Sequence, residues 1–442
     1  MFQGCRKLIK QYQFYLMFKR TMLVILVLCC CDLQSDEIEE PAIDQPLVEL
    51  NLFTAVSLAV KNHPSIRAKR SEVAAARSDL SAAKWSAFPE LSFSSQAVYS
   101  NENTRVVTLS QPLWTGGQVS AGIDLAEASV DVAQGEMGAQ KSEIIKEAVA
   151  AFFNVVAADK KLSIYRSNID EHERLVGIIS RRSSAQTSPE VDVMLARARL
   201  AQAISQEAQI KTNLHVAQAE LEQLLGQQID SVKFVSNEDR FFDSLSRPLI
   251  ELEAQAINYS PYLDVLTASV GRAEANVRLA KSEGRPKIAL GYEKRYGEVL
   301  FGQEREQVYL GLNYQPGAGL SSARRLTAAK SRRQSVIMDR STAERELRRD
   351  LQMLLMQHQS AKNQIQTSKE LVLATQEVVF SYLRQYSVGR KSWLDALNAQ
   401  RESVQARDAL INFELSYSRS GIQLMVLLGL IDGGVTKLEL IK

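Results

Sequence analysis

The feature that most constrains the fold of this chain is an internal duplication of about 200 residues. Residues 52–93 align with residues 249–290 at a constant offset of 197. Later the offset is 203, where Asp192 matches Asp395, so the second copy carries six extra residues (203 − 197 = 6). A period this long excludes a solenoid of short repeats. The two repeats are predicted at residues 50–230 and 249–431, with the insertion at a loop tip.

Each copy is expected to contain a helix, two strands, a long helix and a return helix, in that order. The strand segments alternate: Leu91, Phe93 and Tyr99 share one face, as do Leu290 and Tyr292. At about ten residues each, such strands are long enough to cross a bilayer at a tilt. Two soluble hairpins on the ends of a coiled coil would show the same pattern. The four strands are predicted at about 90–99, 104–114, 287–297 and 305–316.

Long gaps between prolines leave room for very long helices, because proline breaks a helix interior. No proline lies between Pro112 and Pro189, and none follows Pro316. Helices are predicted over about 117–183 and 321–386, each roughly 100 Å long at about 1.5 Å per residue. The first return helix carries a seam with spacings of three and four residues, which is typical of a coiled coil. This seam consists of Val193, Ala196, Leu200, Ala203, Glu207, Ile210, Leu214, Ala217, Leu221 and Leu224.

One chain supplies four strands, which are too few to close a barrel. Lipid does not tolerate the unpaired edges of an open sheet, so strands that enter a bilayer must be pooled between chains. Two chains would contribute eight strands, and three would contribute twelve. The predicted fold class is therefore mainly α with β: a duplicated helix–strand–strand–helix unit, a long α-helical coiled-coil barrel and a shared transmembrane β-barrel.

The N-terminus has the layout of an export signal, with a basic segment, a short apolar run at 22–28 and then cysteines. Residues 1–31 are therefore predicted to be a signal peptide. A cysteine at the end of the apolar run is typical of a bacterial lipoprotein. Cys31 is the lipidation candidate, with Cys30 as second choice and ordinary signal cleavage as the alternative. The other segments outside the repeats are predicted as an N-terminal linker at 32–49, an equatorial linker at 231–248 and a C-terminal tail at 432–442.

Charge and motif content exclude several classes of function. Lys plus Arg total 53 against 51 for Asp plus Glu, and this balance argues against a protein that holds nucleic acid by bulk charge. All four cysteines lie in the first 31 residues, so the rest of the chain has no thiolate metal site. The four histidines are scattered, and no HExxH, phosphate-loop or GxSxG motif is present. The sequence therefore predicts no catalytic residue, no cofactor and no metal, and any energy must come from a partner.

Several stretches resemble the TolC family of outer-membrane efflux and secretion channels. They are LNLFTAVSLAVKNHPSIRAKRSEVAAARSDLSAAKWSAFPELSFS, LSQPLWTGGQ, AELEQLLG and QYSVGRKSWLDALNAQRESVQAR with the later LLGL, and the likeness covers about residues 50–430. The resemblance implies a homotrimer in the outer membrane of a Gram-negative bacterium. Its twelve-stranded β-barrel would lie in outer-membrane lipid, and its helical tunnel would cross the periplasm. The implied partners are a periplasmic membrane-fusion adaptor and an inner-membrane transporter of ABC or RND type.

The resemblance also places a gate at the tips of the helical hairpins, where ionic and hydrogen-bonding contacts close the periplasmic end of the tunnel. Tyr386 matches the family's tyrosine, and Lys391 replaces an arginine, which loses the bidentate fork. Asp395 matches one aspartate, whereas Asn398 replaces a second and loses its charge. Asp192 matches the facing aspartate of the first copy. The tip expected to contact the adaptor consists of Ser387, Val388, Gly389 and Arg390; the alternative is a solvated hairpin cap.

Two further points bear on function. A periplasmic coiled-coil adaptor or scaffold would also have long helices, but an adaptor is expected to carry a β-domain between its arms rather than strand pairs in both copies. The stretch LNYQPGAGLSSARR resembles the equivalent stretch of channels that serve type I secretion of large adhesins, with multidrug efflux as the alternative.

At the first hairpin tip, Gln186 stands where the family usually has glycine, which puts adaptor contacts at that tip in question.

Overall fold

The computed structural model describes residues 49–98, 102–232, 242–297, 304–315 and 317–431. The predicted signal peptide with Cys31, the C-terminal tail, Tyr99 and much of both predicted linkers lie outside these ranges.

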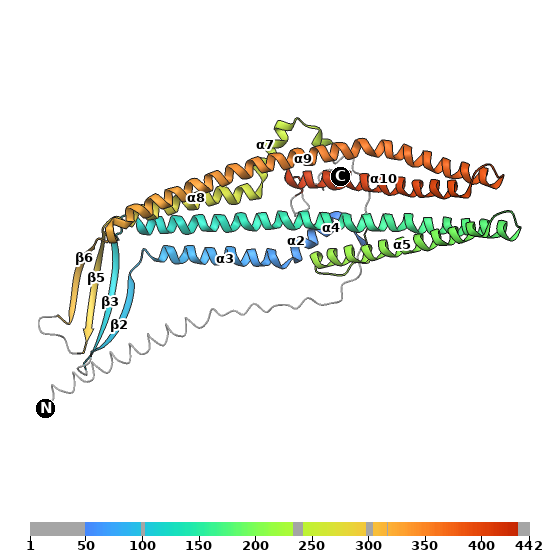
Figure 1. Cartoon of the computed structure of the whole chain (residues 1–442). Coiled ribbons are helices and arrows are strands. Elements are labelled where there is room, and N and C mark those ends of the chain that lie inside the picture. The colour runs from blue at the N-terminus through green and yellow to red at the C-terminus, as the bar shows by residue number, and fades with distance from the viewer. Residues whose placement is uncertain (1–48, 99–101, 233–241, 298–303, 316, 432–442) are drawn as a thin grey trace, which may run out of the picture. The chain divides into compact units, whose positions relative to one another are not determined.

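The mainly helical, duplicated fold class is confirmed (Figure 1), but two helices, rather than the one predicted, precede the strands of each copy, because the helix breaks before Pro64 and Pro261. The first copy comprises α2 (Leu52–Asn62), α3 (Pro64–Trp85), β2 (Glu90–Val98), β3 (Glu102–Trp114), α4 (Gln118–Ser184) and α5 (Glu190–Leu225). The second comprises α7 (Leu249–Tyr259), α8 (Pro261–Ser282), β5 (Lys287–Tyr296), β6 (Glu306–Asn313), α9 (Ser321–Ser387) and α10 (Trp393–Leu427). Short elements complete the chain: β1 (Glu49–Leu50), β4 (Ser231–Val232) and the 3-10 turns η1 (Asp243–Ser246) and η2 (Ala318–Leu320).

Local sequence explains where the shorter helices begin. The side chain of Asn51 accepts a hydrogen bond of 2.8 Å from the backbone N–H of Thr54 and so caps α2. Helices α3 and α8 each have a proline, Pro64 and Pro261, in their first position. Proline fits there because the N–H that it lacks would have no partner within the helix.

The strands form one antiparallel sheet in the order β2-β3-β5-β6, which leaves β2 and β6 as unpaired edges within the chain. Its two faces differ in chemistry, as the alternation predicted. One face is apolar and largely exposed, with Leu91 opposite Leu109 and Leu290 opposite Leu310. The other face is mostly polar, and the ring of Tyr309 lies so close over Gly291 that a Cβ there would clash with it.

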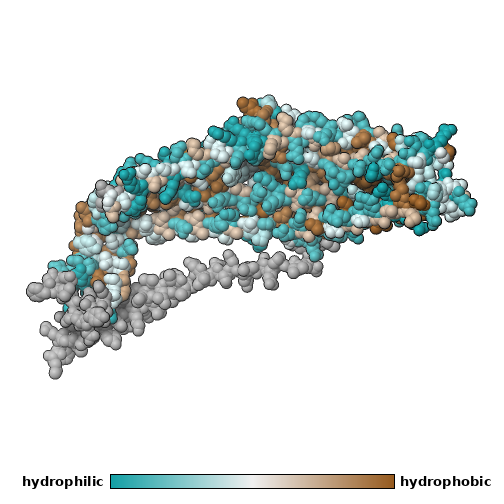
Figure 2. All heavy atoms as spheres, viewed as in Figure 1, coloured by the Kyte–Doolittle hydropathy of each residue, from teal (hydrophilic) through white to brown (hydrophobic). Residues whose placement is uncertain are grey.

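Two antiparallel helical hairpins, α4 with α5 and α9 with α10, make up most of the structure (Figure 1). The predicted seam is the face of α5 that packs on α4: six of its ten residues are buried, and the other four are half-buried. Above the tips, Phe152 and Phe153 of α4 are completely buried in a core shared with the end of α10. Burial of one such ring contributes about 2–3 kcal/mol. Hydrophilic residues cover much of the outer surface of the helices (Figure 2).

Each return helix ends against the first short helices of its own repeat. The Asn62 side chain donates a hydrogen bond of 2.9 Å to the carbonyl of Leu225 at the end of α5. In the second copy, Gln255 donates one of 2.8 Å to the carbonyl of Leu428. Helix α3 therefore extends the line of α5 towards the sheet, and helix α8 extends the line of α10 (Figure 1). None of the helices in the described part of the chain is both long and apolar enough to span a membrane.

Candidate functional site

The first hairpin turns from α4 to α5 through a left-handed residue. The backbone N–H of Gln186 donates to the Ser183 carbonyl, and that of Thr187 donates to the Arg182 carbonyl, both at 2.9 Å. These two bonds define a Schellman motif, which requires a residue with positive φ. Gln186 takes that conformation with φ 57°, although a side chain there costs about 1 kcal/mol relative to glycine. The sequence pointed to this position, and the structure shows its strain.

The second hairpin uses the same turn with glycine at the matching position. Gly389 donates to the Tyr386 carbonyl at 3.0 Å, and Arg390 donates to the Gln385 carbonyl at 2.8 Å. Gly389 has φ 73°, with open space around it. Ser387, Val388, Gly389 and Arg390 are all exposed, so this tip presents itself to solvent.

Asp395 holds the start of α10. Its carboxylate accepts hydrogen bonds from the hydroxyl of Ser392 at 2.8 Å and from the Ser392 backbone N–H at 3.3 Å, while its own N–H donates back to that hydroxyl at 3.2 Å. This reciprocal arrangement is a capping box. The hydroxyl bond, then the backbone bond and the charge of Lys391 hold the pKa of Asp395 below its usual range. In the single chain, the predicted gate aspartate therefore stabilises its own helix.

Lys391 lies beside this cap. Its Nζ is 3.9 Å from the Asp395 carboxylate and 4.5 Å from the centre of the Tyr382 ring. Both side chains are more than a third exposed to solvent, which screens the charges, so the pair adds little to stability.

Tyr386 joins the two hairpins. Only 7% of its surface is exposed, and its ring packs 5.5 Å from that of Trp393. Its hydroxyl lies 3.3 Å from the hydroxyl of Ser188, which belongs to the first hairpin tip. Around Tyr386 of α9, the tip cluster draws apolar side chains from three other helices, α4, α5 and α10: Leu175, Ile179, Val193, Ala196, Trp393, Ala396 and Leu397.

Arg182 contacts both hairpins, and sequence reasoning did not identify it. From the last turn of α4, its Nη1 donates to the carbonyls of Tyr386 at 3.0 Å and Ser387 at 3.4 Å, across the hairpin boundary. Its guanidinium also lies 4.7 Å from the centre of the Tyr386 ring. A positive charge at the C-terminus of α9 is favourable, because the last carbonyls of a helix carry partial negative charge. A basic residue near a helix end is a weak signal, and only the fold shows that it reaches the other hairpin.

Asp192 and Asn398, the remaining predicted gate residues, are half-buried near the starts of α5 and α10. Among the described residues, neither side chain makes a hydrogen bond or ion pair with the other predicted gate residues. In the single chain, Ser188 rather than Asp192 meets the hydroxyl of Tyr386.

Polar contacts also join the hairpins above the tips. The buried Gln400 donates to the buried Asn168 at 3.3 Å. Further up, Lys161 lies 3.5 Å from Asp408 and Lys160 lies 3.7 Å from Glu414. Each hairpin is thus held internally by an apolar seam, whereas the two hairpins are joined by the apolar tip cluster and, between the tips and the core, by polar contacts.

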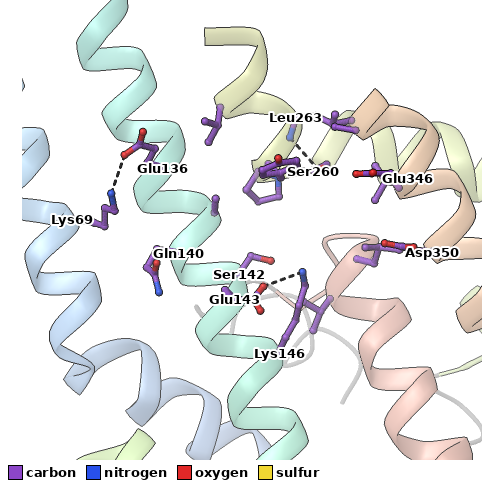
Figure 3. A pocket seen from close by; sticks show the side chains of 18 residues that line it. Lys69, Glu136, Gln140, Ser142, Glu143, Lys146, Ser260, Leu263, Glu346 and Asp350 are labelled. Atoms are coloured by element: carbon purple, nitrogen blue, oxygen red, sulfur yellow. Dashed lines mark hydrogen bonds and ion pairs between the residues drawn. The ribbon is translucent and has the colours of Figure 1, made fainter. Parts of the chain in front are cut away.

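A pocket of about 510 Å³ lies where α10 ends against the start of α8 (Figure 3). Two ion pairs line it, Lys69 with Glu136 at 2.9 Å and Lys146 with Glu143 at 3.4 Å. Among the described residues, no three His, Cys, Asp or Glu side chains are placed to hold a metal ion. The pocket is a gap between the packed helices α3, α4, α8, α9 and α10, and we assign no ligand to it.

Comparison with known proteins identifies the fold and the family. The family model described as "Outer membrane efflux protein" matches residues 55–227 and 252–430, the two repeats. The cobalt-zinc-cadmium resistance protein CzcC of Cupriavidus metallidurans is 26% identical over 368 residues, which cover 81% of this chain and 85% of CzcC. Protein CyaE of Bordetella pertussis is 25% identical over 325 residues, covering 67% of this chain and 66% of CyaE.

The structure is also similar to the crystal structure of CusC. The TM-score is 0.74 at 18% identity, over 86% of this chain and 92% of that one. Family and fold are those of transport channels rather than enzymes. They do not favour the alternative hypothesis of a periplasmic coiled-coil adaptor or scaffold. With both repeats matched, the chain belongs to the outer membrane efflux protein family and is an exit duct in the outer membrane of a Gram-negative bacterium.

Proposed function

We propose that three copies of the chain form one duct, with twelve strands in the outer membrane and the helical hairpins as a tube in the periplasm. The observation that carries this proposal is the four-stranded sheet, which has two unpaired edges and one exposed apolar face. Unpaired edges are unstable in lipid, so β2 of one copy would pair with β6 of the next. The helices next to the sheet pack in the order α3-α4-α8-α9, which leaves α3 and α9 free to meet in the same ring.

The duct is closed at the hairpin tips. Tyr386, Lys391, Asp395, Asn398 and Asp192 are the proposed gate residues, and Arg182 with Ser188 adds the contacts that hold the two hairpins of one copy together. Opening requires the second hairpin to move away from the first. That movement separates the apolar tip cluster, and the polar contacts between the hairpins exchange with water, whereas the apolar seams keep each hairpin intact.

The exposed tip at Ser387, Val388, Gly389 and Arg390 is the proposed docking site for a periplasmic membrane-fusion adaptor. The adaptor would connect the duct to an inner-membrane transporter of ABC or RND type, which supplies the energy. The relatives do not point to one cargo, since CzcC is named for cobalt, zinc and cadmium resistance and the name of CyaE states none. We propose that the transporter, not the duct, selects the cargo, whether a drug, another small molecule or a secreted protein. Identification of the transporter that co-purifies with the duct tests this.

Outside the described residues, we propose that residues 1–31 are a signal peptide and that Cys31 is the lipidated residue of the mature chain. Intact mass spectrometry tests this, because a mature N-terminus beyond Cys31 would exclude lipidation there. We also propose the two repeats at 50–230 and 249–431 as the domains, with linkers at 32–49 and 231–248 and a tail at 432–442.

The trimer is tested by the mass of the protein in detergent, measured by light scattering with the detergent contribution subtracted. A mass of three chains is expected. A stable single chain would refute the proposal, because its sheet would keep two open edges in the membrane.

A further inference from the structure

Basic residues gather where the helices meet the sheet. Within about one turn of this junction, six side chains are basic and two are acidic, a net charge of +4 per chain. The exposed apolar face of the sheet begins next to this junction, so the positive charges lie beside an apolar surface. We name these residues the basic collar: Lys84, Lys281, Arg285, Lys287, Arg324 and Arg325, with Glu90 and Glu283 as the acids.

Exposed aromatic side chains lie at the same level. Trp85 is 66% exposed at the end of α3, and Phe88, whose ring lies 4.9 Å from that of Trp85, is 56% exposed. Trp114 at the end of β3 and Tyr314 after β6 are also exposed. Tryptophan and tyrosine favour the boundary between lipid chains and headgroups, where one end of the ring is apolar and the other is wet. These residues mark the level of the lipid headgroups.

Three exposed cations of the collar have no partner among the described residues, and Lys287, also without one, is half-buried. Arg285 donates to the carbonyl of Gly116 at 3.0 Å, and Arg325 lies 3.2 Å from Glu283. Lys84, Lys281 and Arg324 are exposed and make no hydrogen bond or ion pair among the described residues.

In the proposed ring, like charges would face each other across the boundary between copies. Lys84 lies in the last turn of α3 and Arg324 in the first turn of α9, and these two helices would meet between neighbouring chains of the proposed trimer. The nearest acid on α3 is Asp79, five residues and about 7.5 Å along the helix from Lys84. Glu90, which begins β2 at the same boundary, supplies one negative charge against these two cations, so the remaining positive charge is stabilised by an anion.

We infer that the basic collar binds the phosphate groups of anionic phospholipids in the periplasm-facing leaflet of the outer membrane. This inference rests on the proposed trimer and its membrane insertion. The helices lie on the periplasmic side, so the collar faces that leaflet, and Lys and Arg side chains at such a boundary extend towards phosphate. Bound lipid would separate Lys84 of one copy from Arg324 of the next, and would fix the depth of the duct in the membrane.

The test measures which lipids stay on the full-length protein after extraction into detergent. Native mass spectrometry in mixtures of phosphatidylglycerol and phosphatidylcholine gives the preference for the anionic lipid. In the variant Lys84→Gln, Lys281→Gln, Arg324→Gln, this preference should fall about fivefold for each cation removed. The matched variant Arg197→Gln, Lys211→Gln, Lys369→Gln removes the same charges from exposed positions away from the junction and should bind as the unmodified protein does.

An unchanged preference in the first variant, or an equal loss in the matched variant, would overturn the inference. A second measurement separates that failure from failure of insertion. With Trp85 as the only tryptophan (Trp114→Phe, Trp393→Phe), lipids brominated near the headgroup should quench its fluorescence more than lipids brominated near the chain end. Quenching without anionic preference would refute phosphate binding alone. If no brominated lipid quenched Trp85, the membrane would not reach the junction, and both proposals would fail.

Discussion

Replacement of Arg182 by methionine should open the gate, because this side chain fastens the first hairpin to the end of the second. Methionine keeps much of the length and the apolar stem but removes the guanidinium. The variant therefore loses the hydrogen bonds of 3.0 Å and 3.4 Å to the carbonyls of Tyr386 and Ser387, and it loses the contact of the guanidinium with the Tyr386 ring. The turn itself is made by backbone hydrogen bonds and should persist.

The size of the effect follows from these interactions. A hydrogen bond from a charged group contributes about 1.5–3 kcal/mol, and the second bond here is long. The Nε of Arg182 is buried without a partner among the described residues, which offsets part of the gain. We therefore expect a destabilisation of the closed tip by about 2 kcal/mol for each copy, equivalent to about a 30-fold shift towards the open tip.

Single-channel recording in planar bilayers measures this shift directly as open probability. Arg181→Met is the matched control, because Arg181 is the exposed neighbour in the same last turn of α4. Arg182→Lys keeps the charge without the planar fork and should fall between the two. Intact trimers of Arg182→Met that conduct no more than those of Arg181→Met would refute the role of Arg182.

Three other predictions concern the tips. Gln186→Gly should stabilise the first tip by about 1 kcal/mol, and Gly389→Ala should destabilise the second by a similar amount, since both positions need positive φ; hydrogen exchange of the turn amides measures both. The double variant Tyr386→Phe with Asp395→Ala should raise conductance while trimer stability, followed by thermal dissociation, stays nearly unchanged. The pKa of Asp395 is lowered in the folded state, so its capping contribution is present above the unfolded value near 4 and is lost as pH falls through the folded value. Conductance of the unmodified protein should therefore rise below about pH 4. The variant Asp395→Asn has no ionisable group at this position, so it should lack the part of this rise that Asp395 causes. The same pH profile in both proteins would contradict the prediction.

Much of the fold could be predicted because it depends on local rules. The gaps between prolines predicted helices over 117–183 and 321–386, and α4 and α9 span Gln118–Ser184 and Ser321–Ser387. The seam of α5 followed from spacing alone. The last strand was expected to reach about 316, but β6 ends at Asn313. Its last paired residue, Asn313, lies opposite Lys287, the first residue of β5, so the ladder stops where its partner strand begins.

The candidate site was less predictable because its contacts join residues far apart in the chain. Arg182 and the carbonyl of Tyr386 are 204 residues apart, and Asn168 and Gln400 are 232 apart. Periodicity reports which face of a helix is buried, but not which hairpin lies against it. The family resemblance supplied Tyr386, Lys391 and Asp395. It did not indicate that Asp395 caps its own helix or that Ser188 takes the hydroxyl of Tyr386.

Disulfide cross-linking between the two sheet edges tests the central claim, a sheet shared by three chains, most directly. Strands β2 and β6 are separated within one chain by β3 and β5, about 14 Å across, which is too far for a disulfide. A cysteine at Ser94 on β2, combined in turn with one at Gln307, Tyr309 or Gly311 on the same face of β6, can therefore join only different copies. The native cysteines are replaced, and single-cysteine variants serve as controls. We predict that oxidation in outer membranes gives a covalent ladder that ends at three chains for at least one pair. A ladder that ends at two or continues past three, or no cross-link at any register, would contradict the shared twelve-stranded sheet.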